Sequence, residues 1–558
     1  MTEVLDRQPK IILVGERLQH RAFNGSNQAL PWLASALHNN GFDNVVQFDM
    51  ENRNNTFTKL LHEVEDADLI TFSGTFSVSL GQIDQDAAVL KNHLRRIRRG
   101  EVPIIVGGYG ASGVDRYAQH APFIDAFSFG PGIEQVPQIV RSVRERRFYQ
   151  DLRESKIPGL SYYDHDLGKY VRATPIPMPS SEVLSSIDQL YERDYMPEIH
   201  DMEIFSGEDG KPLSTFQLVT EMGCPFECTF CSESGGEQEQ MLMGRRVTAE
   251  MSLGAVEEHF IKARELGHTS AYLDIETAFR DWKRMEAILE LANSYGISIG
   301  LNTRIDTARK DRIVRAADLG VDYMFFGVEH TNPQALMAVD KFTEANLLAR
   351  AQKAIGYSRN VDDAFMWQNE KKIQSSLFLI MGLPKIDDVS WQKVLSGKLT
   401  RSSDLVYVQT SYEDDVIAIE GTMSRCQPFH FNTNILRLNP DTKMAWQSRY
   451  ACIRPSGAED LDAVYYVPRV AQLLGIGLQD FHPIYRFYEG VEDQQPYSTA
   501  MDPQRAHDTA CIILREANKY GVHVYFDYEL EKSGLITGNP KEGVDYKIAS
   551  LKDFEGLK

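Results

Sequence analysis

Long apolar runs and a leader-like start are both missing from this 558-residue sequence. No stretch of 18 or more residues is continuously apolar, although a helix needs about 20 such residues to cross a bilayer. The opening residues Met-Thr-Glu-Val-Leu-Asp carry neither the basic nor the apolar part of a signal peptide. We therefore expect a cytoplasmic protein with no membrane partner.

Cysteine and positive charge are also scarce. Six cysteines are too few for a disulfide framework in a chain of this length. Lysine and arginine number 59 against 79 aspartates and glutamates, and the net charge of -20 would repel a phosphate backbone. This balance argues against a nucleic-acid partner. With 42% apolar residues the chain can bury several cores, so we expect two or three domains.

Three of the six cysteines are nevertheless gathered in one short stretch. Cys224, Cys228 and Cys231 form a C-x3-C-x2-C motif directly after the extended run 214–219. Three thiolates on one loop can bind three irons of a [4Fe-4S] cluster and leave the fourth iron open to an exchangeable ligand. Structural zinc would need a fourth ligand, and no second knuckle follows. The remaining alternative is a set of ordinary buried cysteines.

The N-terminal part alternates short apolar strands with helical patterns. The predicted strands are residues 10–14, 44–48, 69–72, 104–106 and 126–129, and the pattern predicts a doubly wound, Rossmann-like parallel sheet. Ligands of such sheets bind at the carboxyl ends of the strands. Small residues follow there, namely Ser73, Gly74 and Thr75, then Gly107 and Gly108. These turns let a backbone approach a ligand, although tight turns also use glycine without any ligand.

A second series of strands and helices begins near residue 213. Predicted strands at 214–219, 270–274, 298–302, 323–328, 376–381 and 405–410 favour a partial (β/α)6 barrel. We therefore divide this α/β protein into residues 1–145, a linker at 146–212, the barrel at 213–424 and a C-terminal α+β extension at 425–558. Residues 361–372 are interpreted as an insertion that covers the barrel mouth.

Polar residues follow the predicted barrel strands, at the edge where parallel barrels place their sites. They are Asp274, Glu276, Asn302, Arg304, Glu329 and Gly382, the last in a Gly-Leu-Pro turn. Charged groups at an apolar mouth are costly to desolvate unless they meet a ligand or one another. Each one alone could also be a solvated rim residue.

The stretch Gly223-Cys-Pro-Phe-Glu-Cys-Thr-Phe-Cys231 resembles the signature of the radical S-adenosylmethionine superfamily. The resemblance implies that S-adenosylmethionine binds the open iron and that its reductive cleavage yields a 5'-deoxyadenosyl radical. It also implies an electron donor such as flavodoxin or ferredoxin. By the same resemblance Arg304 would pair with the methionyl carboxylate, and Glu329 would bind the ribose hydroxyls or the amino end.

A Rossmann-like domain ahead of this motif resembles the cobalamin-binding domain of the cobalamin-dependent subgroup. The turns at Ser73–Thr75 and Gly107–Gly108 would then line the slot for the nucleotide tail. Residues 15–25 lack the D-x-H-x-x-G motif, so we do not expect His20 to ligate cobalt. Residues 419–422 resemble the proline-glycine-threonine turn that ends the barrel in this family, with Glu420 at the proline position.

The resemblance implies cobalamin-dependent methylation of an unactivated carbon. The alternatives are a radical rearrangement, dehydration, ring contraction or cyclisation without cobalamin as methyl donor, and a cluster that only senses redox state. We expect a small secondary-metabolite intermediate as substrate, with His482 and Tyr485 as candidate contacts. The separated Cys426, Cys452 and Cys511 are expected to be ordinary cysteines, with a second cluster as the alternative.

Overall fold

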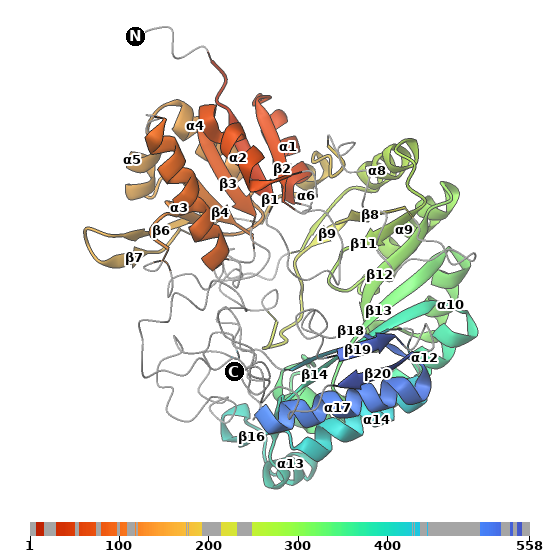
Figure 1. Ribbon diagram of the computed structural model, residues 1–558. Helices are drawn as coiled ribbons and strands as arrows, with labels where there is room; N and C mark the ends of the chain where they lie inside the picture. Colours follow the sequence, from red (N-terminus) through yellow and green to blue (C-terminus); the bar gives the residue numbers. More distant parts are fainter. Residues whose placement is uncertain are drawn as a thin grey trace.

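The computed structural model describes residues 7–15, 29–50, 55–73, 80–97, 101–108, 118, 121–174, 176, 178–191, 214–231, 248–426, 428, 430–435, 444, 503–525, 536–539 and 544–548. Within these residues two mainly parallel sheets organise the chain (Figure 1). The first sheet belongs to the N-terminal part, and the second, larger one to the remainder. No helix of the described residues is long and apolar enough to span a bilayer.

The N-terminal sheet has the strand order β2-β1-β3-β4-β5-β6-β7. Its first five strands are parallel: β1 (Ile11–Gly15), β2 (Val45–Asp49), β3 (Leu69–Ser73), β4 (Ile104–Gly107) and β5 (Ala126–Ser128). The antiparallel strands β6 (Leu160–Asp164) and β7 (Lys169–Val171) extend it, so this sheet continues past residue 145.

Helices cover both faces of this sheet because its strands bury apolar residues on both sides. Alternate residues of β1 enter two separate cores, with Ile12 in one and Leu13 in the other. The first core is closed by α2 (Phe57–Glu63) and α3 (Leu80–Arg96), and the second by α1 (Ala29–His38) and α4 (Gln135–Arg144). The prediction of a doubly wound sheet is therefore confirmed.

The second sheet has seven parallel strands in the order β18-β17-β14-β13-β12-β11-β8. They are β8 (Thr215–Leu218), β11 (Ser270–Leu273), β12 (Ser298–Arg304), β13 (Val321–Glu329), β14 (Gln374–Met381), β17 (His430–Ile435) and β18 (His523–Tyr525). The strands curve into an open barrel, with α8 (Leu253–Glu265), α9 (Trp282–Ser294), α10 (Lys310–Asp318) and α12 (Leu347–Glu370) along its outer side (Figure 1). The partial barrel predicted from the sequence is confirmed.

Three details of that prediction were wrong. The predicted sixth strand, 405–410, yields only β16 (Tyr407–Gln409), which pairs antiparallel with β15 (Pro384–Ile386) outside the barrel. Val406 and Val408 are exposed, whereas Leu405 and Tyr407 pack against the core from outside the barrel sheet, so only one side of this run is covered. The sixth parallel strand is instead β17, and β18 adds a seventh.

The other two details concern helices. Residues 361–372 are not an insertion: α12 runs without interruption through most of them and buries Val361, Ala364 and Phe365 at helical spacing. Residues 419–422 are not a turn, because they lie inside α14 (Tyr412–Cys426) and bury Ile419 and Thr422.

The segment 180–191 connects the two sheets. The Asp188 N–H donates to Ser35 Oγ of α1, at 2.9 Å. The side chain of Gln189 binds both backbone groups of Val219: its Nε2 donates to the carbonyl at 2.7 Å, and its Oε1 accepts from the N–H at 2.9 Å. The backbone N–H of Gln189 donates to Nε2 of His259 on α8, at 3.0 Å. The end of β8 is thereby fixed to the N-terminal layer.

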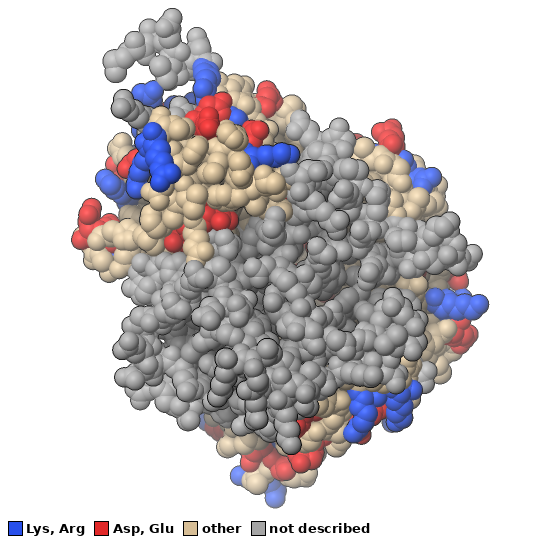
Figure 2. All heavy atoms as spheres, viewed as in Figure 1, with Lys and Arg blue, Asp and Glu red and all other residues tan. Residues whose placement is uncertain are grey.

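Charges on the described surface are mixed. In the view of Figure 2, basic and acidic side chains alternate over the N-terminal helices and over the outer barrel helices. Many of them form ion pairs between neighbouring elements, such as Arg315 of α10 with Glu286 of α9, at 2.7 Å. The pattern on this face is that of an ordinary solvated surface.

Candidate active site

The cysteine loop leaves β8 and crosses the carboxyl edge of the barrel sheet. Just before the cysteines, β9 (Glu221–Met222) pairs antiparallel with β10 (Ala249–Glu250). Between Cys228 and Cys231, the Thr229 N–H donates to the carbonyl of Val339, at 3.0 Å. Phe230 packs against the buried Ile380 and Leu383 after β14. Backbone pairing and apolar packing therefore hold this loop at the barrel mouth.

All three thiols of the loop are free of disulfides. Cys228 is buried, and Cys224 and Cys231 are half-buried. Burial raises the pKa of the Cys224 thiol to about 11, so a metal that binds there must displace its proton. Within the described residues, no three His, Cys, Asp or Glu side chains are already gathered at metal-ligand spacing. The donor set, three thiols on one loop, fits an iron–sulfur cluster.

Arg304, at the end of β12, lies directly behind this loop. Its Nη1 donates to the Cys228 sulfur at 3.3 Å, and its guanidinium carbon lies 3.9 Å from the centre of the Phe226 ring. Its other donors bind Asp306, at 2.9 and 3.1 Å, and the carbonyl of Lys341, at 2.6 Å. Burial alone would raise the pKa of Asp306, but the charge of Arg304 outweighs it and the net pKa is lowered.

A second buried ion pair stands at the end of β13. Lys341 Nζ lies 2.9 Å from Glu329 Oε1 and donates to the carbonyl of Gly327 at 3.0 Å. The Tyr357 hydroxyl of α12 donates to the same carbonyl, at 3.1 Å. A Cβ added at Gly327 would come within 2.7 Å of Glu329 Oε1. Glycine is thus required for the carboxylate to reach the ammonium.

The end of β11 places two carboxylates at the mouth. Glu276 is exposed at the rim of the mouth, and Asp274 is half-buried. Neighbouring protein groups limit the hydration of the Glu276 carboxylate, and this desolvation, and secondarily the charge of Asp274, raises its pKa to about 7. Burial also raises the pKa of Asp274. Beneath them the Tyr272 hydroxyl donates to Asn302 Oδ1 of β12. Of these groups, Glu276 is the one that can change its protonation state near neutral pH.

Gly382 is held from behind by a fully buried aspartate of α14. Asp415 Oδ1 accepts from the Gly382 N–H at 3.4 Å and from the Thr410 hydroxyl at 3.2 Å. His330 Nε2 approaches the same oxygen at 3.4 Å, while its Nδ1 accepts from the Asn332 N–H at 2.9 Å. This network fixes the turn after β14.

The N-terminal sheet presents a smooth carboxyl edge. Gly15, Ser73 and Gly107 lie side by side in register at the ends of β1, β3 and β4. Gly108 has a left-handed φ of 87°, which favours glycine. A Cβ on Gly107 would meet Ser128 at 3.6 Å. Gly15 is buried, whereas Ser73, Gly107 and Gly108 are half-buried, so β3 and β4 offer the accessible small residues of this edge.

Several predicted site residues lie outside the described residues: Gly74, Thr75, His20, Cys452, His482 and Tyr485. Cys426 is fully buried at the end of α14, and burial raises its pKa to about 12, as expected for an ordinary core cysteine. The sequence reasoning missed Lys341 and Tyr357 as members of the site, and it placed Asp306 at the end of the third barrel strand without giving it a role. Lys341 carried a usable signal, because it is a lone lysine in the apolar stretch 335–342.

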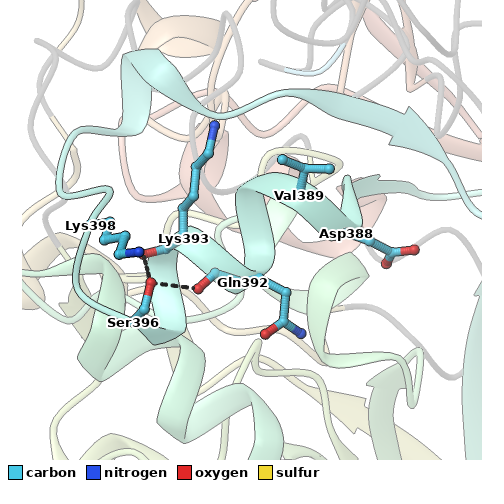
Figure 3. Close-up of a pocket in the computed structure, with 6 residues that line it drawn as sticks. All are labelled: Asp388, Val389, Gln392, Lys393, Ser396 and Lys398. Carbon is cyan, nitrogen blue, oxygen red and sulfur yellow. Dashed lines mark hydrogen bonds between the residues drawn. The ribbon is translucent and has the colours of Figure 1, made fainter.

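One surface pocket, of about 460 Å³, lies on α13 (Asp388–Leu395) and is lined by Asp388, Val389, Gln392, Lys393, Ser396 and Lys398 (Figure 3). Ser396 Oγ is turned back onto the carbonyl of Gln392, at 2.9 Å. None of the strand-end side chains contributes to this pocket. It is therefore separate from the candidate site.

A doubly wound N-terminal sheet followed by an open parallel barrel with a cysteine loop at its mouth is the fold of cobalamin-dependent radical S-adenosylmethionine enzymes. This chain has that fold. It is similar to TsrM, a radical S-adenosylmethionine methyltransferase from Kitasatospora setae, with a TM-score of 0.60 at 17% identity over 91% of this chain and 89% of TsrM. One TsrM structure holds its substrate tryptophan with aza-SAM, an analogue of S-adenosylmethionine, and another holds cobalamin with a [4Fe-4S] cluster.

A second likeness is to OxsB, a cobalamin-dependent S-adenosylmethionine radical enzyme, with a TM-score of 0.54 at 14% identity over 95% of this chain and 75% of OxsB. Among curated proteins, the uncharacterized methyltransferase PH0819 from Pyrococcus horikoshii is 23% identical over 278 residues. That match spans 50% of this chain and 54% of PH0819, about half the length of each. No protein-family model matches the sequence.

Proposed function

We propose that this protein is a radical S-adenosylmethionine enzyme that methylates an unactivated carbon of a small secondary-metabolite intermediate with the help of cobalamin. The observation that carries the proposal is the docking of the C-x3-C-x2-C loop at the carboxyl edge of the barrel, where Cys228 meets Arg304 of β12. The fold of TsrM and OxsB supports the same function.

In this proposal Cys224, Cys228 and Cys231 hold a [4Fe-4S] cluster, and S-adenosylmethionine binds its open iron. When bound, these groups supply a one-electron cleavage that gives a 5'-deoxyadenosyl radical, and cobalamin supplies the methyl group. The loop's own contribution is to keep its three thiols on the mouth side of the sheet. Its packing through Phe230 anchors the loop to an apolar cluster beside β14.

The strand ends would bind S-adenosylmethionine. Asp274 and Glu276 offer carboxylates from β11, and Asn302 offers an amide from β12. Glu329 is already neutralised by Lys341, so the pair can meet a polar ligand without leaving a lone buried charge. The Gly382 turn, held by Asp415, would contact the adenine side.

The carboxyl edge of the N-terminal sheet would bind cobalamin. Ser73 and Gly107 are neighbours in register, and the turns that continue from them, Gly74–Thr75 and Gly108, would border the nucleotide tail. This edge lies at the reversal of strand order in the sheet, the usual ligand site of such folds. The absence of bulky side chains on Gly15, Ser73 and Gly107 fits a large ligand.

The proposed partners follow from this chemistry. A flavodoxin or ferredoxin would deliver the electron, and the reducing cytoplasm would preserve the cluster. The strong excess of acidic residues leaves nucleic acid an unfavourable partner.

The test is anaerobic reconstitution with iron, sulfide and hydroxocobalamin, followed by desalting and reaction with S-adenosylmethionine under reduction. About one retained cobalt per chain, together with S-adenosylhomocysteine among the products, would support methyl transfer. Formation of 5'-deoxyadenosine without retained cobalt or S-adenosylhomocysteine would favour a radical rearrangement over methyl transfer. If the wild type cleaves no S-adenosylmethionine while its cluster is intact, both the methyl-transfer and the rearrangement hypotheses are wrong. The Cys228→Ser variant is the control that should show no cleavage.

A further inference from the structure

Every nitrogen of the Arg304 guanidinium already donates to a group of the protein. It is 6% exposed. The Nε and Nη2 edge, which best fits a carboxylate, is occupied by both oxygens of Asp306. Nη2 also donates to the Lys341 carbonyl, and Nη1 to the Cys228 sulfur. A methionyl carboxylate would have to displace Asp306 from a buried ion pair, which is costly.

We infer that Arg304 is a positioning residue of the iron–sulfur cluster, which holds the Cys228 thiolate and makes the cluster easier to reduce, and that it is not the partner of the S-adenosylmethionine carboxylate. This inference rests on the proposed function, because it requires a cluster on the three cysteines. It departs from the role that the family resemblance implied for Arg304.

Two loop residues meet the same guanidinium. Phe226 lies over it and Cys228 accepts from it, so the segment between Cys224 and Cys228 is stacked and hydrogen-bonded to the end of β12. The guanidinium itself cannot turn away, because Asp306 holds it on the opposite edge. Lys353 of α12 in turn lies 3.8 Å from Asp306. The loop is therefore braced against two elements of the barrel.

The same contact has an electrostatic consequence. Reduction adds one negative charge to a cluster whose sulfurs already carry negative charge. An N–H donated by a cation to a ligating sulfur stabilises that added charge, and hydrogen bonds to the sulfurs are among the factors that set cluster potentials. Arg304 should raise the reduction potential, and Asp306 should moderate the effect because its charge is opposite.

Three variants test the inference: Arg304→Gln, Asp306→Asn and Arg312→Gln as matched control. Arg312 is a partly buried arginine whose side chain donates to the carbonyls of Phe279 and Thr307. Each protein is reconstituted anaerobically without S-adenosylmethionine, and the cluster is titrated by paramagnetic resonance against a redox series. The affinity for S-adenosylmethionine is then measured by equilibrium dialysis.

Arg304→Gln should lower the potential, so that the ratio of reduced to oxidised cluster at a fixed potential falls about tenfold, which is about 59 mV for one electron. Asp306→Asn should shift it in the opposite direction, and Arg312→Gln should leave it unchanged. The affinity of Arg304→Gln for S-adenosylmethionine should stay within a few-fold of wild type.

An unchanged potential combined with a lost affinity for S-adenosylmethionine in Arg304→Gln would overturn the inference and restore the carboxylate role. If Arg304→Gln assembles no cluster, the Asp306→Asn variant tests the inference instead. An unchanged reduction potential in Asp306→Asn would also overturn the inference. Failure of the proposed function is distinguished from both, since the wild type itself would then assemble no four-iron cluster.

Discussion

At Glu329 the backbone is left-handed, with a φ of 66°, and the side chain is almost fully buried. Such a conformation costs about 1–3 kcal/mol in a residue other than glycine and persists only where its surroundings fix it. Here the carboxylate is fixed by Lys341 Nζ, and it occupies the place that a side chain on Gly327 would otherwise take. The strained backbone at Glu329 therefore fixes the direction in which the Glu329 carboxylate points.

Lys341→Met should destabilise the chain by about 3–5 kcal/mol, because it leaves the Glu329 carboxylate buried without its partner. The double variant Glu329→Gln/Lys341→Met should recover most of that loss. Denaturant midpoints of the three proteins measure both effects. A loss below about 1 kcal/mol, the range of an exposed ion pair, would show that the pair is hydrated in solution.

Glu276 makes the stability depend on pH. Its pKa of about 7 lies above the ordinary value of 4.5, so the folded chain holds this proton more tightly than the unfolded chain. Stability should therefore fall as pH rises from about 4.5 to 7. Glu276→Gln should become more stable relative to wild type across that window, measured by thermal unfolding at several pH values. The exposed Glu258→Gln on α8 is the control, and an equal response of both variants would contradict the assignment.

At the scale of elements, the connector 180–191 replaces a missing strand neighbour. β8 is an edge strand of the barrel sheet, and the amide of Gln189 satisfies both backbone groups of Val219 just beyond its end. The same segment binds Ser35 of α1 and His259 of α8. One side-chain amide thus fixes where the cysteine loop begins relative to the N-terminal sheet.

Gln189→Leu should destabilise the junction by about 1–3 kcal/mol for each of the two backbone groups that it leaves unpaired. Gln189→Glu should also destabilise it, because an ionised carboxylate would be buried facing the Val219 carbonyl oxygen. Thermal unfolding and limited proteolysis measure the loss. The half-buried Gln138 on α4 hydrogen-bonds through its amide to its own helix, so Gln138→Leu should lose far less stability. A Gln189→Leu protein as stable as Gln138→Leu would show that the Gln189 amide does not stabilise the junction.

At the scale of the whole molecule, each of the two sheets carries its own candidate site. The proposed division at residues 145, 212 and 424 does not coincide with the sheets, because β6 and β7 prolong the first and β17 and β18 prolong the second. The two layers also share one apolar cluster, in which Trp32 and Ile133 join Phe216 of β8. The sites are distinct, but their supporting cores are continuous.

Cobalt and iron should be separable by mutation. Gly107→Leu, which fills the edge of the N-terminal sheet, should abolish retention of cobalamin and leave the iron content unchanged. Cys228→Ser should abolish the cluster and leave cobalt retention unchanged. Metal analysis after reconstitution and desalting measures both. Parallel loss of the two metals in either variant would mean that one site depends on the other.

The sequence by itself determined the two α/β layers, most strand positions and the cysteine loop, because each depends on local periodicity, glycine placement or close spacing of thiols. It could not determine which strand closes the barrel. The run 405–410 is the more apolar of the two candidates, whereas 430–435 is His-Phe-Asn-Thr-Asn-Ile and carries a weak strand signal. Only tertiary packing left Val406 exposed while β17 paired with β14.

For the candidate site too, the sequence determined some features and the tertiary structure decided others. The strand-end positions of Asn302, Arg304 and Glu329 were predictable, since parallel strands bring their carboxyl ends to one edge. The partners were not: Lys341 lies 12 residues after Glu329, and Cys228 lies 76 residues before Arg304. Contacts across such separations are set by how helices and strands pack in three dimensions. Tertiary structure therefore decided that Arg304 meets a cysteine sulfur and an aspartate.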